Sequence, residues 1–211
     1  MSDAREQILS RIRATVRVSP AAVDRLYRRR GALAVDDRVV RFQERVSDYR
    51  ADVRRTDASA VVATIETICA DHGVRRLAVP AGLPAEWRPK DVELVEADEL
   101  DAVSLDVLDG ALTGCTLAIA ETGTILLSAG PIEGPRALTL VPDLHICVVR
   151  ESQIVELVPE AIAGIHALVA EERRPVTFVS GPSATSDIEL SRVEGVHGPR
   201  TLVVLIVKET E

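Results

Sequence analysis

Apolar residues in the first fifty positions recur every three or four residues, which is the spacing of amphipathic helices. Ile8 and Ile12 belong to the first stripe, which stops before a Ser-Pro pair at residues 19–20. A second, short segment stops at Gly31. Three helices are therefore predicted, over residues 3–17, over residues 21–30, and around Val39, Phe42, Val46 and Tyr49.

From residue 57 the pattern changes to short apolar runs separated by helical segments. The run LVVLIV at residues 202–207 is apolar at every position, as expected of a strand buried on both faces. Strands are predicted at residues 76–79, 93–95, 116–120, 124–128, 145–149, 176–180 and 201–207, and helices at residues 57–73 and 159–171. This alternation predicts an α/β fold with a mostly parallel, doubly wound sheet. The two runs within residues 116–128 predict a local antiparallel hairpin.

The net charge of −8 is unevenly distributed along the chain. Residues 1–55 carry 14 arginines and 8 acidic residues, whereas the remainder is strongly acidic. We therefore divide the chain into an N-terminal helical arm, residues 1–55, and a domain, residues 56–211. Because acids alternate with arginines along the arm, we expect it to dock onto an acidic surface, of this chain or of a partner, and not onto nucleic acid.

Cysteine spacing and missing motifs exclude several classes of protein. Cys69, Cys115 and Cys147 are scattered among apolar neighbours, which predicts buried thiols and neither a disulfide framework nor a metal or iron–sulfur site. No apolar run approaches the ~20 residues that span a bilayer, and the N-terminus lacks an apolar signal region, so a cytoplasmic location without membrane contact is expected. The dinucleotide, P-loop, zinc-protease and serine-hydrolase motifs are absent, so no cofactor or metal is expected on this chain.

The segment from Phe178 to Glu189 carries the first candidate site. It reads as the end of a strand, a Gly-Pro turn and the start of a helix, so its free backbone N–H groups suit a carboxylate or phosphate beyond the strand's carboxyl end. The alternative is a helix start with ordinary caps, since Ser186 and Glu189 have capping-box spacing. The anion-binding candidates here are Gly181, Ser183, Thr185, Ser186 and Asp187.

A second candidate is the turn formed by Glu121, Thr122, Gly123 and Thr124. A carboxylate at the end of an apolar strand can serve as general base or nucleophile if burial tunes its pKa, and the hydroxyls and glycine next to it can contact an anion. The alternative is a polar hairpin turn, because Thr and Gly are routine turn formers.

The third candidate is the loop before the last strand, where two glycines flank a histidine. His197 titrates near neutrality and Gly198 permits close backbone approach to a ligand, although a tight loop with a solvated histidine is an equal alternative. Arg136 is a candidate anion clamp through its bidentate guanidinium. His145 lies inside a predicted strand and is interpreted as a buried histidine with a satisfied hydrogen bond.

Four segments in this order resemble the lactate utilization protein C (LutC/YkgG-type) family, which carries the LUD domain: AIAETGTILL from residue 118, RALTLVPDLHI from residue 136, GPSATSDIE from residue 181 and GVHGP from residue 195. The resemblance covers residues 57–211, so the domain at residues 56–211 is expected to be a LUD domain. It implies a fold like that of the NagB/RpiA/CoA transferase-like proteins. It also implies a part in oxidising L-lactate to pyruvate together with partner proteins that carry cysteine-ligated iron–sulfur clusters, which this chain lacks the cysteines to hold.

Three functions remain open on the sequence. In the first, the chain is a non-redox component of a lactate-oxidising complex that binds a small carboxylate or its iron–sulfur partners. In the second, it is a stand-alone enzyme of the coenzyme A transferase or cyclo-ligase type, with Glu121 as nucleophile or base and His197 as a further catalytic candidate. In the third, it is a structural or regulatory adaptor. The oligomeric state is left open.

Overall fold

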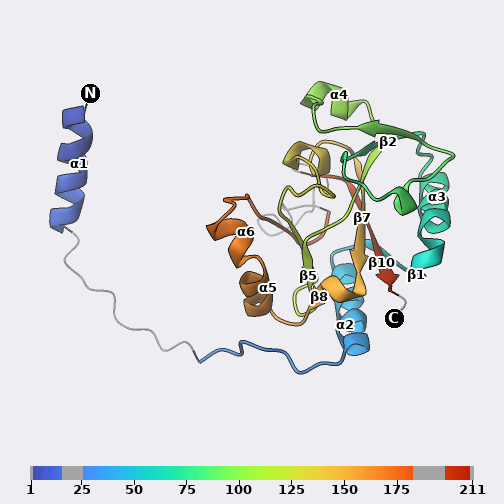
Figure 1. The fold of residues 1–211 in the computed structure, drawn as a ribbon, viewed down its shortest axis with the longest axis horizontal. Coiled ribbons are helices and arrows are strands. Elements are labelled where there is room, and N and C mark those ends of the chain that lie inside the picture. Colours follow the sequence, from blue (N-terminus) through green and yellow to red (C-terminus); the bar gives the residue numbers. More distant parts are fainter. Residues whose placement is uncertain (1, 16–25, 183–197, 210–211) are drawn as a thin grey trace.

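The computed structural model describes residues 2–15, 26–182 and 198–209. Figure 1 shows a mixed α/β body, with helix α1 (Ser2–Thr15) standing away from it. The apolar stripe of α1 faces no other part of the described chain, since Ile8 is 59% and Ile12 is 54% exposed. The predicted helix at residues 3–17 is thus present over its described part, but it contributes nothing to the core.

The large sheet has six strands, all parallel to their neighbours. The strands β10 and β7 are neighbouring interior strands and are buried along nearly their whole length, as the LVVLIV run predicted for β10. In spatial order the strands are β1 (Asp52–Asp57), β10 (Thr201–Lys208), β7 (Leu144–Arg150), β4 (Gly110–Thr113), β2 (Arg76–Val79) and β3 (Glu93–Glu96). The prediction of a mostly parallel α/β sheet is confirmed.

A second, four-stranded sheet packs against one face of the large sheet. The predicted hairpin is its centre, since β5 and β6 pair antiparallel across the turn at residues 120–123. The order is β8 (Ile154–Val155), β5 (Leu117–Ile119), β6 (Thr124–Leu127) and β9 (Thr177–Val179). Strand β9 thus pairs with β6 and belongs to the small sheet, not to the large one.

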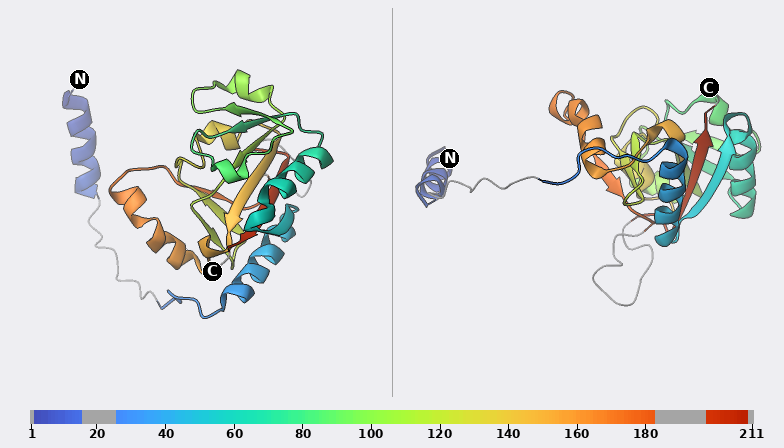
Figure 2. Two further views of the ribbon diagram at one scale, coloured as in Figure 1. Left: turned by 45° about the vertical axis from the view of Figure 1, so that its right-hand side comes forward. Right: turned by 90° about the horizontal axis from the view of Figure 1, so that it is seen from below.

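Helices cover both faces of the large sheet. Helix α3 (Val61–Asp71) packs Ile65 and Ile68 onto one face, and α2 (Val35–Asp48) packs Phe42 onto the other face together with the small sheet. The outer face of the small sheet is covered by α5 (Val158–Gly164) and α6 (His166–Ala170), and α4 (Ala102–Asp106) lies near the edge strands. Figure 2 shows α3 and the α5–α6 pair on opposite sides of the body.

The predicted strands agree with the structure to within one residue at each end, but four elements were not predicted. These are β1, β4, β8 and α4, which are short or carry charges that hide their pattern. The expected single helix at residues 159–171 is broken at Ile165 into α5 and α6. Asp57 makes no side-chain cap bond, and a 3-10 turn at Ala58–Ala60 precedes α3.

Two expectations about the arm differ from the structure. Residues 26–30 are not helical, so the short helix ending at Gly31 is absent from the described part of that segment. The boundary expected after residue 55 falls inside β1, which pairs with β10 from Asp52 to Asp57. Helix α2 also belongs to the core, because Phe42 is fully buried. The physical reason is that the apolar stripe of α2 fills the space between the large and small sheets.

Candidate functional site

The structure brings Arg136, Gly181 and Gly198 to one cavity of about 90 Å³. These three candidates come from segments far apart in the sequence: the 3-10 turn Arg136–Thr139, the end of β9 and the start of β10. The candidates that lie outside the described residues are Ser183, Thr185, Ser186, Asp187 and His197. The assignment of the predicted residues to one functional site therefore stays a prediction.

The cavity lies beyond the carboxyl end of β9 but at the amino ends of β7 and β10. Ser180 and Gly181 follow β9, whereas His145 is the second residue of β7 and Pro199 precedes β10. The expected position at a strand's carboxyl end thus holds for β9 alone. In the large sheet the cavity lies at the amino ends of the strands, opposite to the expected end. The reason is that β9 belongs to the small sheet, and its carboxyl end lies where β7 and β10 begin.

Arg136 supplies the positive charge of the cavity. Its Nη1 donates to the carbonyl oxygen of Thr139 at 3.1 Å and to Thr139 Oγ1 at 2.7 Å. These bonds close the 3-10 turn on itself and hold the guanidinium in one orientation. Partial burial lowers the pKa of Arg136 from its ordinary value, yet the group remains a cation at any physiological pH. The sequence prediction of an anion clamp is compatible with this fixed, partly desolvated charge.

His145 lines the cavity from the large sheet and is only 2% exposed. Its Nε2 lies 2.8 Å from Thr113 Oγ1 on the neighbouring strand β4. Burial, followed by the charge of Arg136, lowers its pKa from 6.5 to about 4, so the ring is neutral near pH 7. The interpretation of His145 as a buried histidine with a satisfied hydrogen bond is confirmed. Its contact with the cavity was not predicted, because a strand pattern shows burial and not which space a side chain adjoins.

A chain of hydroxyl groups runs from the β5–β6 turn to the cavity wall. Thr122 Oγ1 lies 2.7 Å from Thr124 Oγ1, which in turn lies 2.8 Å from Ser180 Oγ. Ser180 lines the cavity, so the second candidate segment reaches it through its threonines. The two threonines are connected to the cavity wall through Ser180 and do not line the cavity themselves.

Two glycines allow the backbone around the cavity to pass close to α2. Gly123 has φ +62°, and a Cβ there would lie 2.7 Å from the backbone carbon of Arg45. Gly181 has φ +87°, and its Cβ would lie 2.6 Å from Cβ of Tyr49. Both positions therefore require glycine for two independent reasons, conformation and space.

Glu121 does not line this cavity. Its carboxylate forms an ion pair with Arg28 at 3.0 Å, and the two side chains are 44% and 63% exposed. The ion pair with Arg28 occupies this carboxylate, which in its position outside the cavity does not contact a guest bound there. The structure thus gives Glu121 a contact with the arm in place of a position in the cavity.

Sequence reasoning missed a second polar cluster, where the arm is fixed to the body. The carboxylate of Glu156 accepts the backbone N–H groups of Ala32 at 2.6 Å and Leu33 at 2.7 Å, and Glu160 accepts that of Gly31 at 3.1 Å. The Leu33 N–H is the main reason that the pKa of Glu156 lies below its ordinary value. The signal was present in the sequence, since Glu156 is an acid between the apolar pairs Ile154-Val155 and Leu157-Val158.

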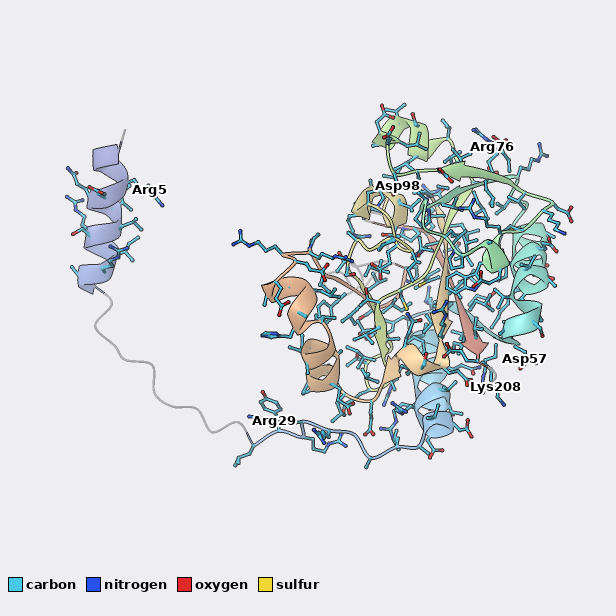
Figure 3. All side chains as sticks on the ribbon, in the orientation of Figure 1. Arg5, Arg29, Asp57, Arg76, Asp98 and Lys208 are labelled. Carbon is cyan, nitrogen blue, oxygen red and sulfur yellow. The ribbon has the colours of Figure 1, made fainter. Side chains whose placement is uncertain are left out.

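Residues 31–33 of the arm therefore bind acidic groups of the same chain, which is one of the two surfaces expected for it. They do so as an extended segment and not as a helix. Arg29, labelled in Figure 3, lies on this segment below α5. Together with Tyr27 and Arg30 it borders a shallow groove on α5 and α6.

The three cysteines are buried and free, as predicted. Within residues 2–15, 26–182 and 198–209, no group of three or more His, Cys, Asp or Glu side chains is arranged to hold a metal ion. Among the helices of this part of the chain, none combines the length and the apolar character needed to cross a bilayer.

Known proteins resemble this chain over most of its length. The sequence model of the LUD domain matches residues 40–207. The chain is 47% identical over 167 residues to "Lactate utilization protein C" of Deinococcus radiodurans, covering 79% of this chain and 77% of that protein. It is 26% identical over 180 residues to a protein of the same name from Halalkalibacterium halodurans, covering 80% and 78% of the two chains.

A solved structure is similar as well. A crystal structure described as a "duf162 family protein" from Deinococcus radiodurans matches with a TM-score of 0.73 at 40% identity, over 83% of this chain and 99% of that one. This likeness supports the α/β architecture. It does not test the expected relation to the NagB/RpiA/CoA transferase-like fold, which stays a prediction.

Proposed function

Because the chain belongs to the LUD-domain family, we propose that it is a non-redox component of an L-lactate utilization system and binds a small carboxylate in the cavity at Arg136. The observation that carries the proposal is the fixed guanidinium of Arg136 in a cavity of about 90 Å³. A cavity needs about 10–15 Å³ to hold one water molecule, so this space has room for a small organic acid in place of several waters. Relatives named for lactate utilization support a guest of that kind.

The redox step would belong to partner proteins. The described residues offer no cluster of metal ligands, and the three cysteines are buried at separate places along the chain without the spacing of an iron–sulfur ligand set. We therefore propose that iron–sulfur proteins act together with this chain in oxidising L-lactate to pyruvate. In that system, this chain would bind the carboxylate and keep it oriented, and the electrons would pass to the clusters of its partners.

Growth on L-lactate tests this proposal. A strain lacking the gene is complemented with the native chain, with Arg136→Leu, or with Arg75→Leu as a control arginine whose side chain is exposed. We expect growth with the native chain and the control but not with Arg136→Leu, and normal growth of all strains on glucose. Pull-down of the native chain should recover iron–sulfur proteins. Full growth of the deletion strain on lactate, with no second copy of the gene, would rule the function out.

The coenzyme A transferase or cyclo-ligase alternative receives no support from the site geometry, because Glu121 is paired with Arg28 and does not line the cavity. The adaptor alternative predicts a different result for growth on L-lactate. If the chain only holds its partners together, Arg136→Leu should restore growth as well as the native chain does.

A further inference from the structure

Helices α5 and α6 present apolar side chains to solvent beside the arm. Val158 and Ile162 are 37% and 48% exposed, and Val169 on α6 is 47% exposed. Val158, Ile162 and His166 follow each other at intervals of four residues, which is the spacing of one helix face, and all three line one groove. Exposed apolar side chains that gather in this way indicate a contact surface for another molecule.

The extended segment of the arm completes this groove and supplies positive charge to it. Tyr27, Arg29 and Arg30 line the groove, which has a volume of about 640 Å³. The guanidinium carbon of Arg29 lies 5.7 Å from the centre of the Tyr27 ring, a cation–π contact that keeps the charge at the groove. Arg28 is paired with Glu121 and Glu156, whereas Arg29 and Arg30 form no ion pair with any residue that the structure describes.

The acidic side chains of this region do not neutralise the groove. Glu160 of α5 accepts the backbone N–H groups of Gly31, Glu156 and Leu157, and so it is occupied in holding the arm and the start of the helix. Among the described residues, no carboxylate lines the groove. The groove therefore combines an apolar lining with two positive charges that have no acid beside them.

Helix α1 of a second copy is an amphipathic segment that this chain itself offers, but its charges do not match the groove. The exposed stripe of α1 consists of Ile8 and Ile12. Arg5 and Arg11 lie three residues before and after Ile8, so they lie next to it on the surface of the helix. If this stripe entered the groove, arginines would face arginines, which costs binding energy. The groove instead fits a helix whose apolar stripe is flanked by acids.

We propose that the groove formed by the arm and α5–α6 binds an acidic amphipathic helix of a partner protein. Apolar side chains of that helix would lie on Val158 and Ile162, as in other complexes of a helix in a groove. Its Asp or Glu side chains would pair with Arg29 and Arg30, which gives specificity and speeds association. The groove shares no lining residue with the cavity at Arg136, so the inference goes beyond the proposed function and does not depend on carboxylate binding.

Two synthetic peptides of about 18 residues, long enough to form a helix, test this proposal by fluorescence anisotropy with the full chain. Both carry leucine at the same positions, three and four residues apart, and the flanking positions are glutamate in one peptide and lysine in the other. We expect the acidic peptide to bind with a dissociation constant at least about tenfold lower, and this difference to shrink as salt is added. Equal binding of the two peptides, or binding of neither, would overturn the proposal.

Charge reversal shows whether the acidic peptide binds in the groove. The double variant Arg29→Glu, Arg30→Glu should weaken its binding at least about tenfold, because two attractive contacts become repulsive. The control is Arg75→Glu, Lys208→Glu, which changes the net charge equally at two exposed positions outside the groove and should bind as the native chain does. If the two double variants bind the peptide equally well, the groove is not its site.

The apolar part of the contact and the alternative of a second copy are tested together. Ile162→Ser should weaken binding of the acidic peptide about tenfold, whereas Val103→Ser, at a 75% exposed position on α4, should not. Sedimentation of the native chain reports whether it associates with itself. A dimer that Ile162→Ser converts to a monomer would show that a second copy covers the groove, and this result would overturn the proposal of an acidic partner.

Discussion

Gly123 connects the local sequence to the packing of the cavity. The sequence placed it in a hairpin turn, and the structure confirms both the turn and the positive φ of +62°. What the sequence could not show is the neighbour, because α2 is separated from the turn by more than seventy residues. The close approach to the backbone of Arg45 becomes visible only when the two segments are packed together.

Replacing Gly123 by alanine should therefore destabilise the fold more than the same change at Gly73. Both residues have positive φ, which costs an alanine about 1–2 kcal/mol, but a Cβ at Gly73 would meet no atom within 4 Å. At Gly123 the backbone of α2 has to move as well. Urea unfolding of the two variants measures the difference, which should exceed about 1 kcal/mol. Equal losses would show that α2 moves aside without cost.

His145 provides a test that depends on pH. Its lowered pKa means that the folded chain leaves the ring neutral between about pH 6.5 and 4, whereas the unfolded chain protonates it there. The unfolded state then binds more protons, so the free energy of unfolding falls as the pH is lowered through this window, by about 3 kcal/mol for this group. Histidine NMR signals, assigned with His145→Gln, should show no protonation of His145 until the pH is well below 6. A midpoint near 6.5 would mean that the ring is exposed to water.

The elements show where sequence periodicity is sufficient and where it fails. Long apolar runs such as β10 and β7 were located to within one residue. The edge strand β1 was missed because its sequence, DVRRTD, is charged, which is how an edge strand avoids pairing with other chains. The two-residue strand β8 gives too few positions for any pattern. In the described part of the segment before Gly31, residues 26–30, the expected short helix is absent, and the N–H groups of residues 31–33 bond to Glu156 and Glu160.

The attachment of the arm through these carboxylates makes a prediction about proteolysis. In Glu156→Gln the acceptor for two backbone N–H groups loses its charge, so the arm should detach more often and trypsin should cut faster after residues 28–30. Cleavage of the native chain should also accelerate as the pH falls below about 4.5, because a carboxylate with a lowered pKa stabilises the contact above that value and loses its effect once protonated. The rate of cleavage at low pH is measured with a protease that is active in acid, such as pepsin.

The matched control is Glu99→Gln, an exposed carboxylate on the body. It should be cut at the native rate. Raising the salt concentration should speed cleavage of the native chain only moderately, because the Arg28–Glu121 pair is exposed and screened while the N–H bonds to Glu156 are not. If Glu156→Gln and Glu99→Gln are cut equally fast, the carboxylate does not hold the arm.

For the molecule as a whole, the sequence predicted the architecture better than the position of the site. The order of strands and helices was enough for an α/β fold with a parallel sheet, since few topologies satisfy that order. The cavity was expected at the carboxyl ends of strands because that rule holds for a single open sheet. Here β9 belongs to the second sheet, and its carboxyl end places Gly181 at the amino ends of β7 and β10, where His145 and Arg136 lie. Periodicity cannot show this, because it does not tell which strands share a sheet.

The whole-molecule view also changes how the role of the arm should be tested. A chain that starts at residue 26 keeps α2, β1 and the contacts with Glu156, and we expect it to unfold at the same temperature as the full chain. A chain that starts at residue 56 loses the strand that pairs with β10 and the buried side chains of Val39, Phe42 and Val46. Removing a buried phenylalanine alone costs about 3–5 kcal/mol, a large part of the stability of a domain, so this chain should not fold cooperatively. Thermal unfolding followed by circular dichroism compares the three chains.

Loss of partner binding by the chain starting at residue 56 would thus report unfolding, whereas loss by the chain starting at residue 26 would assign partner binding to α1 and the residues that follow it. A cooperative transition of the chain starting at residue 56 would instead show that α2 and β1 are an appendage and not part of the core.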